Sequence, residues 1–185
     1  MMPEISLNVL DVAENSTRAG AAHVTITVTA DTAADTLTIV IGDDGCGMTP
    51  EQVAQVTDPF FTTRKTRRVG LGVPFFKMAA EMSGGTFAIE SEPGVGTTVT
   101  AVFGFSNVDR MPLGDMASTM HTLITMHEDT DFIYRYTYDG DRFELDTAEM
   151  REILGGVSFS EPEVSQYIRE YLAENEAEVT RDRSI

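Results

Sequence analysis

The sequence contains little that could brace the fold covalently or place it in a membrane. Its 185 residues include a single cysteine, Cys46, and no tryptophan. One cysteine cannot form a disulfide within the chain, and no apolar run reaches the roughly 20 residues of a membrane-spanning helix. The first residues also lack the charged-then-apolar pattern of an export signal. We therefore expect a cytoplasmic protein without membrane insertion.

Basic residues are also scarce. Thirteen lysines and arginines stand against 30 aspartates and glutamates, which gives a net charge of −17. A chain of this charge repels phosphate backbones unless its cations are concentrated in one place, so nucleic acid is not an expected partner. Four cations do lie together, namely Arg64, Lys65, Arg67 and Arg68. Such a cluster is usually a solvated charge run, but between two phenylalanines and a glycine pair in an acidic chain it indicates an anion site.

The three histidines give no metal-binding pattern. His23, His121 and His127 have neither the spacing nor the cysteine partners of a structural metal site. No structural metal is expected.

Apolar spacing up to residue 105 predicts one layered α/β unit. Helical spacing favours helices over residues 3–18, 50–56 and 72–84, and two-residue alternation favours strands over 24–28, 37–41, 86–91 and 97–105. This order of elements is typical of a mixed β-sheet packed under helices. We predict a two-layer α/β (α+β) sandwich.

A glycine-rich segment follows the second predicted strand directly. Residues 43–47, here called the glycine loop, join the carboxylate of Asp43 to two glycines, Gly45 and Gly47. Glycines lack a Cβ atom, so the backbone can turn sharply and approach a ligand closely. An ordinary surface turn is the alternative interpretation.

One face of the first predicted helix gathers a carboxylate, an amide and a cation. Asp11, Asn15 and Arg18 are spaced i, i+4 and i+7, which places them on the same side. A solvated polar face would be the ordinary interpretation if this helix stood alone.

Together these motifs resemble the ATP-binding domain of the GHKL superfamily, which includes DNA gyrase B subunits, heat-shock chaperones, histidine kinases and mismatch-repair ATPases. The resemblance covers residues 5–105. It rests on five segments in the family's order: an N box at 11–21, glycine boxes at 43–47, 70–72 and 94–98, and an F box at 58–63.

The resemblance implies ATP and Mg²⁺ as cofactors and gives each motif a role. Asp43 is expected to accept a hydrogen bond from the adenine amino group, with Gly45 and Gly47 close to the base. Asn15 matches the magnesium ligand of the family. The expected phosphate contacts are Arg18, Arg64, Lys65, Gly70 and Gly72, and the expected pocket-wall hydroxyls are Thr97 and Thr98.

Asp11 departs from the pattern of the gyrase-like members. The resemblance places Asp11 where those ATPases carry a glutamate that activates water, and aspartate is one methylene shorter. Its role as a general base, and with it hydrolysis, is therefore open. Only about ten residues precede this part of the helix, so neither the dimerising strap of gyrase-like proteins nor the phosphoacceptor hairpin of sensor kinases is expected there.

The remaining residues predict a small appendage. After a linker at 107–114, spacing favours an αββαα unit at 115–173, followed by a polar tail at 174–185. Residues after 106 carry 18 acidic and 7 basic side chains, and three tyrosines alternate along one predicted strand. Such a small domain could pack on the ATP-binding unit or dock to a protein partner. We expect 115–173 to be a separate domain that docks to a partner, and the occurrence of trimmed superfamily members beside multisubunit redox enzymes suggests such an enzyme.

Three functions remain open from the sequence. The first is an Mg·ATP-binding regulatory or conformational subunit of a protein complex. The second is a protein kinase of the histidine-kinase or anti-sigma serine-kinase type, with its phosphoacceptor on another chain. The third is a slow ATPase whose dimerisation is gated by ATP. His127, which is followed by an acid as in sensor-kinase phosphoacceptors, is interpreted as a surface histidine.

Overall fold

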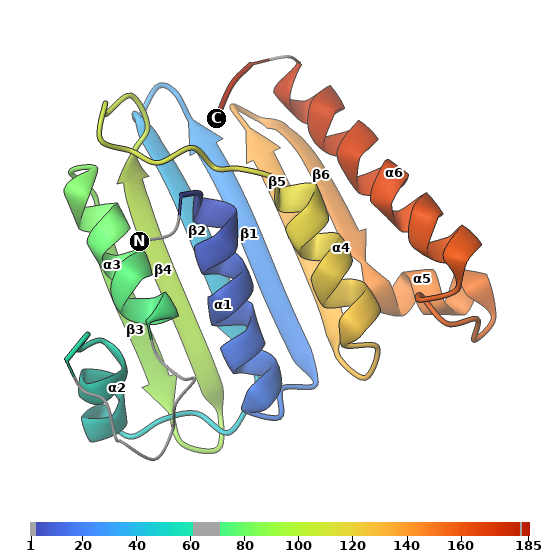
Figure 1. The fold of residues 1–185 in the computed structure, drawn as a ribbon, viewed down its shortest axis with the longest axis horizontal. Coiled ribbons are helices and arrows are strands. Elements are labelled where there is room, and N and C mark those ends of the chain that lie inside the picture. The colour runs from blue at the N-terminus through green and yellow to red at the C-terminus, as the bar shows by residue number, and fades with distance from the viewer. Residues whose placement is uncertain (1–2, 61–70, 182) are drawn as a thin grey trace.

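The computed structural model describes residues 3–60, 71–181 and 183–185. In these residues a six-stranded sheet lies under a layer of helices (Figure 1). The elements in chain order are α1 (Ile5–Arg18), β1 (His23–Asp31), β2 (Thr36–Asp43), α2 (Pro50–Val56), α3 (Gly72–Met82), β3 (Thr86–Glu92), β4 (Gly96–Gly104), α4 (Met116–Met126), β5 (Asp131–Tyr138), β6 (Asp141–Asp146), α5 (Thr147–Leu154) and α6 (Pro162–Thr180).

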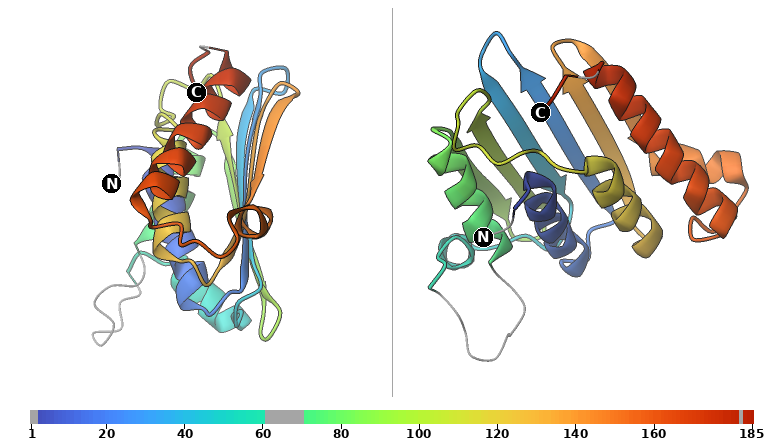
Figure 2. Two further views of the ribbon diagram at one scale, coloured as in Figure 1. Left: turned by 90° about the vertical axis from the view of Figure 1, so that its right-hand side faces the viewer. Right: turned by 45° about the horizontal axis from the view of Figure 1, so that its top comes forward.

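The sheet is mixed. Its strand order is β3-β4-β2-β1-β5-β6, and every neighbouring pair is antiparallel except β1 and β5, which are parallel. Helices α1, α3, α4 and α6 all lie on one face of this sheet, as the edge-on view in Figure 2 shows. The predicted two-layer sandwich is therefore confirmed.

Alternating side chains explain why the layers pack as they do. Along β1, Val24, Ile26 and Val28 are buried, whereas the residues between them are half-buried on the other face. Helix α1 meets this apolar face with Ile5 and Val9, both fully buried. Each such side chain contributes about 1.5–3 kcal/mol by leaving water, so the stripe fixes which face of α1 points to the sheet.

The C-terminal αββαα elements extend the sheet, which corrects the prediction of a separate domain at 115–173. Strand β5 pairs with β1 over the register from His23–Asp131 to Ala30–Tyr138. A lone two-stranded hairpin is marginally stable, whereas the edge of β1 offers unpaired backbone groups that β5 satisfies. The segment predicted as a linker also packs, because the backbone N–H of Ile5 donates to Pro112 O at 3.0 Å.

The alternating tyrosines lie in the core, which removes the exposed aromatic surface expected for docking. Tyr134, Tyr136 and Tyr138 are at most 4% exposed. The hydroxyl of Tyr134 donates to Glu176 Oε1 of α6 at 2.6 Å. The polar tail predicted from residue 174 also begins inside α6, and Val179 near the end of that helix is buried.

In the part of the chain that the structure describes, no helix combines the length and the apolarity needed to cross a bilayer.

Candidate functional site

A cavity of about 250 Å³ opens between α1 and the sheet, next to the glycine loop. Much of its wall is apolar. These apolar residues come from five different elements and are Val12, Val56, Val73, Ile89 and Val99. The cavity thus has room for a small planar group, and its apolar walls favour the burial of a ring.

Asp43 supplies the cavity with a fixed carboxylate. It is the last residue of β2 and lines the cavity. The hydroxyl of Ser16 donates to Asp43 Oδ2 at 2.6 Å, and the backbone N–H of Gly45 donates to Asp43 Oδ1 at 2.9 Å. A carboxylate accepts about four hydrogen bonds, so acceptor capacity remains for a ligand that carries an N–H group.

The glycines around Asp43 are required by close backbone contacts. A Cβ atom on Gly45 would lie 3.1 Å from Asp43 Oδ1. Gly47 has φ +68°, and a Cβ atom there would lie 1.9 Å from the carbonyl oxygen of Glu92. A Cβ atom on Gly96 would lie 2.0 Å from Asp43 O. The backbone of the glycine loop therefore packs directly on the ends of β3 and β4.

The two predicted wall threonines differ in position. Thr97 lines the cavity, and its hydroxyl is 2.7 Å from Ser91 Oγ, which also accepts from Met48 N at 2.8 Å. Thr98 is not among the described lining residues. Successive side chains of a strand point to opposite faces, so the prediction that both threonines line the wall is corrected to Thr97 alone.

Asn15 and Arg18 line one part of the same cavity and contact each other. Arg18 Nη1 donates to Asn15 Oδ1 at 3.0 Å, and the Arg18 residue is exposed. The structure thus brings together an amide oxygen and a cation beside the cavity. A ligand with negative charge could take over the arginine and free the amide oxygen.

Asp11 lies beside the start of α3 and not among the described cavity-lining residues. A Cβ atom on Gly72 would be 2.7 Å from Asp11 Cβ and 3.1 Å from Asp11 Oδ2. Burial raises the pKa of the Asp11 carboxyl, an effect that Arg18 partly offsets and Glu14 reinforces. A raised pKa brings a carboxylate closer to the range in which it can accept a proton as a general base.

Three predicted phosphate contacts, Arg64, Lys65 and Gly70, lie outside the described residues. Of that group of predictions, the structure therefore places Arg18 and Gly72 only. The predicted F box is described up to Phe60.

Sequence reasoning missed Ser16 as a site residue. Ser16 on α1 is 4% exposed, and its hydroxyl donates the hydrogen bond that fixes the Asp43 carboxylate. Its position on the buried stripe of α1, four residues after Val12, is the signal that could have indicated it. The apolar wall was also missed, although the alternation of β3 and β4 places Ile89 and Val99 on the helix-covered face.

His127 is engaged in a local contact. Its Nε2 atom lies 2.9 Å from Glu14 Oε1, and both side chains are about a quarter exposed, at 24% and 23%. His127 follows the last residue of α4. His127 is therefore half-buried against Glu14 and not the free surface histidine that was predicted.

Comparison with known proteins places this site in a family. Residues 2–107 match the family described as histidine kinase-, DNA gyrase B- and HSP90-like ATPase. A probable C4-dicarboxylate sensor kinase of Bacillus subtilis is 36% identical over 69 residues, which are 37% of this chain and 13% of the kinase. The sensor protein SrrB of Staphylococcus aureus is 34% identical over 102 residues, 52% of this chain and 17% of that protein.

The chain spans less than a fifth of the length of these relatives, since the matched segments cover 13% and 17% of them. A solved N-terminal domain of a DNA repair protein has a similar fold, with a TM-score of 0.55 at 14% identity over 78% of this chain and 53% of that one. At this identity the likeness concerns the fold. Because the family match covers more than half of the sequence, the chain belongs to the histidine kinase-, DNA gyrase B- and HSP90-like ATPase family.

Proposed function

We propose that the cavity binds the adenine ring of ATP and that the protein is an Mg·ATP-binding regulatory or conformational subunit of a cytoplasmic protein complex. The observation that carries this proposal is the Asp43 carboxylate, held by Ser16 and Gly45 in an apolar cavity. Adenine presents an amino donor at the position where guanine presents a carbonyl acceptor. A fixed carboxylate therefore favours adenine.

The residues beside the cavity fit a nucleotide's phosphates. Leu71 precedes α3 and has no side-chain group that could cap the helix, so the N–H groups of the first turn, including that of Gly72, are available to an anion. Arg18 adds a positive charge at the cavity. The resemblance to the family implies that the remaining phosphate contacts come from Arg64, Lys65 and Gly70.

One side chain fits a magnesium ion. Mg²⁺ prefers oxygen ligands and usually takes one or two from the protein, the others coming from phosphates and water. The Asn15 amide oxygen is such a ligand and would hold the ion once Arg18 has turned to a phosphate. When bound, the ion neutralises phosphate charge.

A protein kinase is the second candidate function. It is favoured by the relatives, because the two named above are sensor kinases or sensor proteins. In that case the phosphoacceptor lies on a partner chain. Labelled phosphate transferred from ATP to a co-purified protein would support the kinase, whereas tight ATP binding without transfer would support the regulatory subunit.

Calorimetry with ADP and GDP tests the proposal at its base site. We expect ADP to bind at least about 100-fold more tightly than GDP, because guanine would leave the half-buried Asp43 carboxylate facing an acceptor. Equal affinities for the two nucleotides would contradict the assignment of the cavity to adenine.

Asp11→Asn tests the third possibility, slow hydrolysis. If Asp11 acts as the general base, this change should lower ATP turnover by about 100-fold or more and leave ADP affinity within about twofold. Asp11→Glu, which restores the carboxylate, is the matched control and should retain turnover. Unchanged turnover in Asp11→Asn would remove Asp11 from the chemistry.

A further inference from the structure

The turn between α1 and β1 lies between the glycine loop and the connection from α4 to β5. On the first side, Cys46 N donates to Ala19 O at 3.0 Å. On the second side, Asp131 N donates to Ala22 O at 2.8 Å. The turn therefore contacts the base site and the C-terminal elements at once.

Asp44, the residue next to Asp43, fastens the glycine loop to this turn. Its Oδ1 atom accepts hydrogen bonds from the backbone N–H groups of Ala22 at 2.8 Å and His23 at 2.9 Å. Its Oδ2 atom lies 2.7 Å from His23 Nδ1. These hydrogen bonds, those from His23 first, hold the pKa of Asp44 below its usual range, so the carboxylate is charged at neutral pH.

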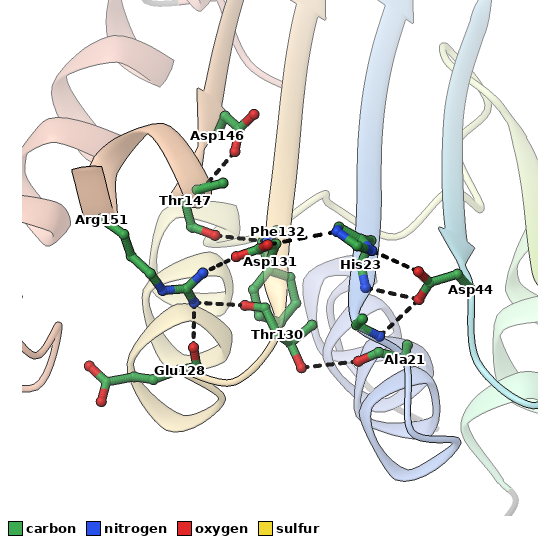
Figure 3. Close-up of polar contacts among 12 residues, drawn as sticks. Ala21, His23, Asp44, Glu128, Thr130, Asp131, Phe132, Asp146, Thr147 and Arg151 are labelled. Carbon is green, nitrogen blue, oxygen red and sulfur yellow. Dashed lines mark hydrogen bonds and ion pairs between the residues drawn. The ribbon is translucent and has the colours of Figure 1, made fainter. Parts of the chain in front are cut away.

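The imidazole of His23 lies between two carboxylates, as Figure 3 shows. Its Nδ1 atom faces Asp44, and its Nε2 atom is 3.7 Å from Asp131 Oδ2 on β5. A neutral imidazole has one N–H donor, so donation to Asp44 leaves a lone pair facing Asp131, whereas the protonated ring donates to both. The imidazole therefore links the glycine loop to the start of β5.

Arg151 continues the chain of contacts into α5. Its guanidinium donates to Asp131 Oδ1 and to the carbonyl oxygens of Glu128 and Thr130. It also lies over the ring of Phe159, 5.2 Å from the ring centroid. Arg151 thus faces the same carboxylate as His23 from the opposite side.

Glu128 connects this group to the segment between α5 and α6. Its carboxylate accepts from the Ser158 hydroxyl at 2.8 Å and from the backbone N–H groups of Phe159 and Ser160. A continuous set of polar contacts therefore runs from the glycine loop to residues 155–161.

We propose that His23, Asp44, Asp131 and Arg151 form a tether that couples the glycine loop to residues 155–161. The tether rests on the proposed function, because the glycine loop is the base site. Its members act as positioning residues, since they hold Asp43 through the loop backbone and touch no part of the cavity themselves. Coupling is reciprocal, so nucleotide binding should order residues 155–161, and loosening that segment should weaken nucleotide binding.

Two readouts on the full chain test the tether, with Arg151→Met and His23→Gln as variants. The first is amide hydrogen exchange of residues 43–47 without nucleotide, which we expect to accelerate at least about fivefold in Arg151→Met. The second is calorimetric ADP affinity at neutral pH, which we expect to fall at least about fivefold in Arg151→Met and in His23→Gln.

Arg135→Met is the matched control. Arg135 pairs with Glu144 at 2.6 Å on β5 and β6, away from the contacts of the tether. Arg135→Met should change neither readout by more than about twofold. Thermal melting identifies any variant that fails to fold. If Arg151→Met does not fold, His23→Gln, which changes an exposed side chain, tests the tether instead. Exchange rates and ADP affinities equal to wild type in the folded variants would overturn the tether. Absence of ADP binding by the wild type would overturn the proposed function. The exchange measurement would still test the tether, because it is made without nucleotide.

Discussion

Asp43→Asn is expected to weaken ADP binding by about 100-fold or more. The change replaces one acceptor oxygen with an amide that donates, so a donor would face the adenine amino group. It also disturbs the hydrogen bonds from Ser16 Oγ and Gly45 N, because only one oxygen remains to accept them. In the complex the amide donor and the adenine donor would each lack a partner, which costs about 1–3 kcal/mol per group and together gives the expected loss. Calorimetry with ADP measures it directly.

The control for this prediction is Asp109→Asn. Asp109 is an exposed carboxylate in the segment after β4, so the same chemical change removes one charge away from the cavity. ADP affinity within about twofold of wild type is expected there, since an exposed distant charge is screened. If Asp43→Asn bound ADP as tightly as the wild type does, the base-recognition role of Asp43 would be wrong.

Glu176→Gln is expected to stabilise the protein above neutral pH. Glu176 of α6 accepts a hydrogen bond from Tyr134, a fully buried tyrosine of β5, at 2.6 Å. Burial raises the pKa of Glu176 to about 7, from an ordinary value of 4.5, and Asp115 at the start of α4 adds to the rise. The charged form is therefore disfavoured in the folded state.

The pH window follows from these two pKa values. Below about pH 4.5 the carboxyl is protonated in both the folded and the unfolded protein, so it imposes no penalty. As the pH rises towards about 7, the unfolded chain ionises freely while the folded protein resists, and stability is lost until both forms are ionised. The largest loss is about 3 kcal/mol, and because the Glu176 residue is only half-buried, about 1–2 kcal/mol is expected.

Urea unfolding of wild type and Glu176→Gln at about pH 4 and about pH 8 measures this effect as a difference between the two proteins. The free energies of unfolding should agree closely at the lower pH, because glutamine and a protonated carboxyl both accept from Tyr134. At the higher pH the variant should be more stable by about 1–2 kcal/mol. Glu174→Gln, at an exposed position on the same helix, is the control; a difference that did not change with pH would show that Glu176 carries no such penalty.

The tether and the Glu176 contact both involve β5, but at different places along that strand. Glu176 holds α6 to β5 within the core, whereas the tether links the glycine loop to the segment before α6 at the N-terminal ends of β1 and β5. Changes at Glu176 should therefore act on global stability, and changes at Arg151 on the local behaviour of the glycine loop. Measuring both variants in both assays separates the two effects.

Much of the fold could be predicted because its signals are local. Two-residue alternation located the strands, and Thr49 with Pro50 marked the start of α2, where the structure has a complete capping box with Gln52. The glycine loop was identifiable because close backbone contacts, such as that of Gly47 with Glu92, leave no room for a side chain. These constraints act within a few residues, so the sequence displays them directly.

Only the tertiary structure decided which segments far apart along the chain contact each other. The sequence by itself determined the elements, their order and the carboxylate that lines the cavity. It did not determine that β5 would join β1, or that Ser16 would hold Asp43 from a distance of 27 residues. The same apolar alternation that predicts a strand suits either a separate hairpin or an added strand of a larger sheet. Only the packed sheet, in which the edge of β1 is completed by β5, fixes the choice and buries the tyrosines that the sequence left free to face solvent.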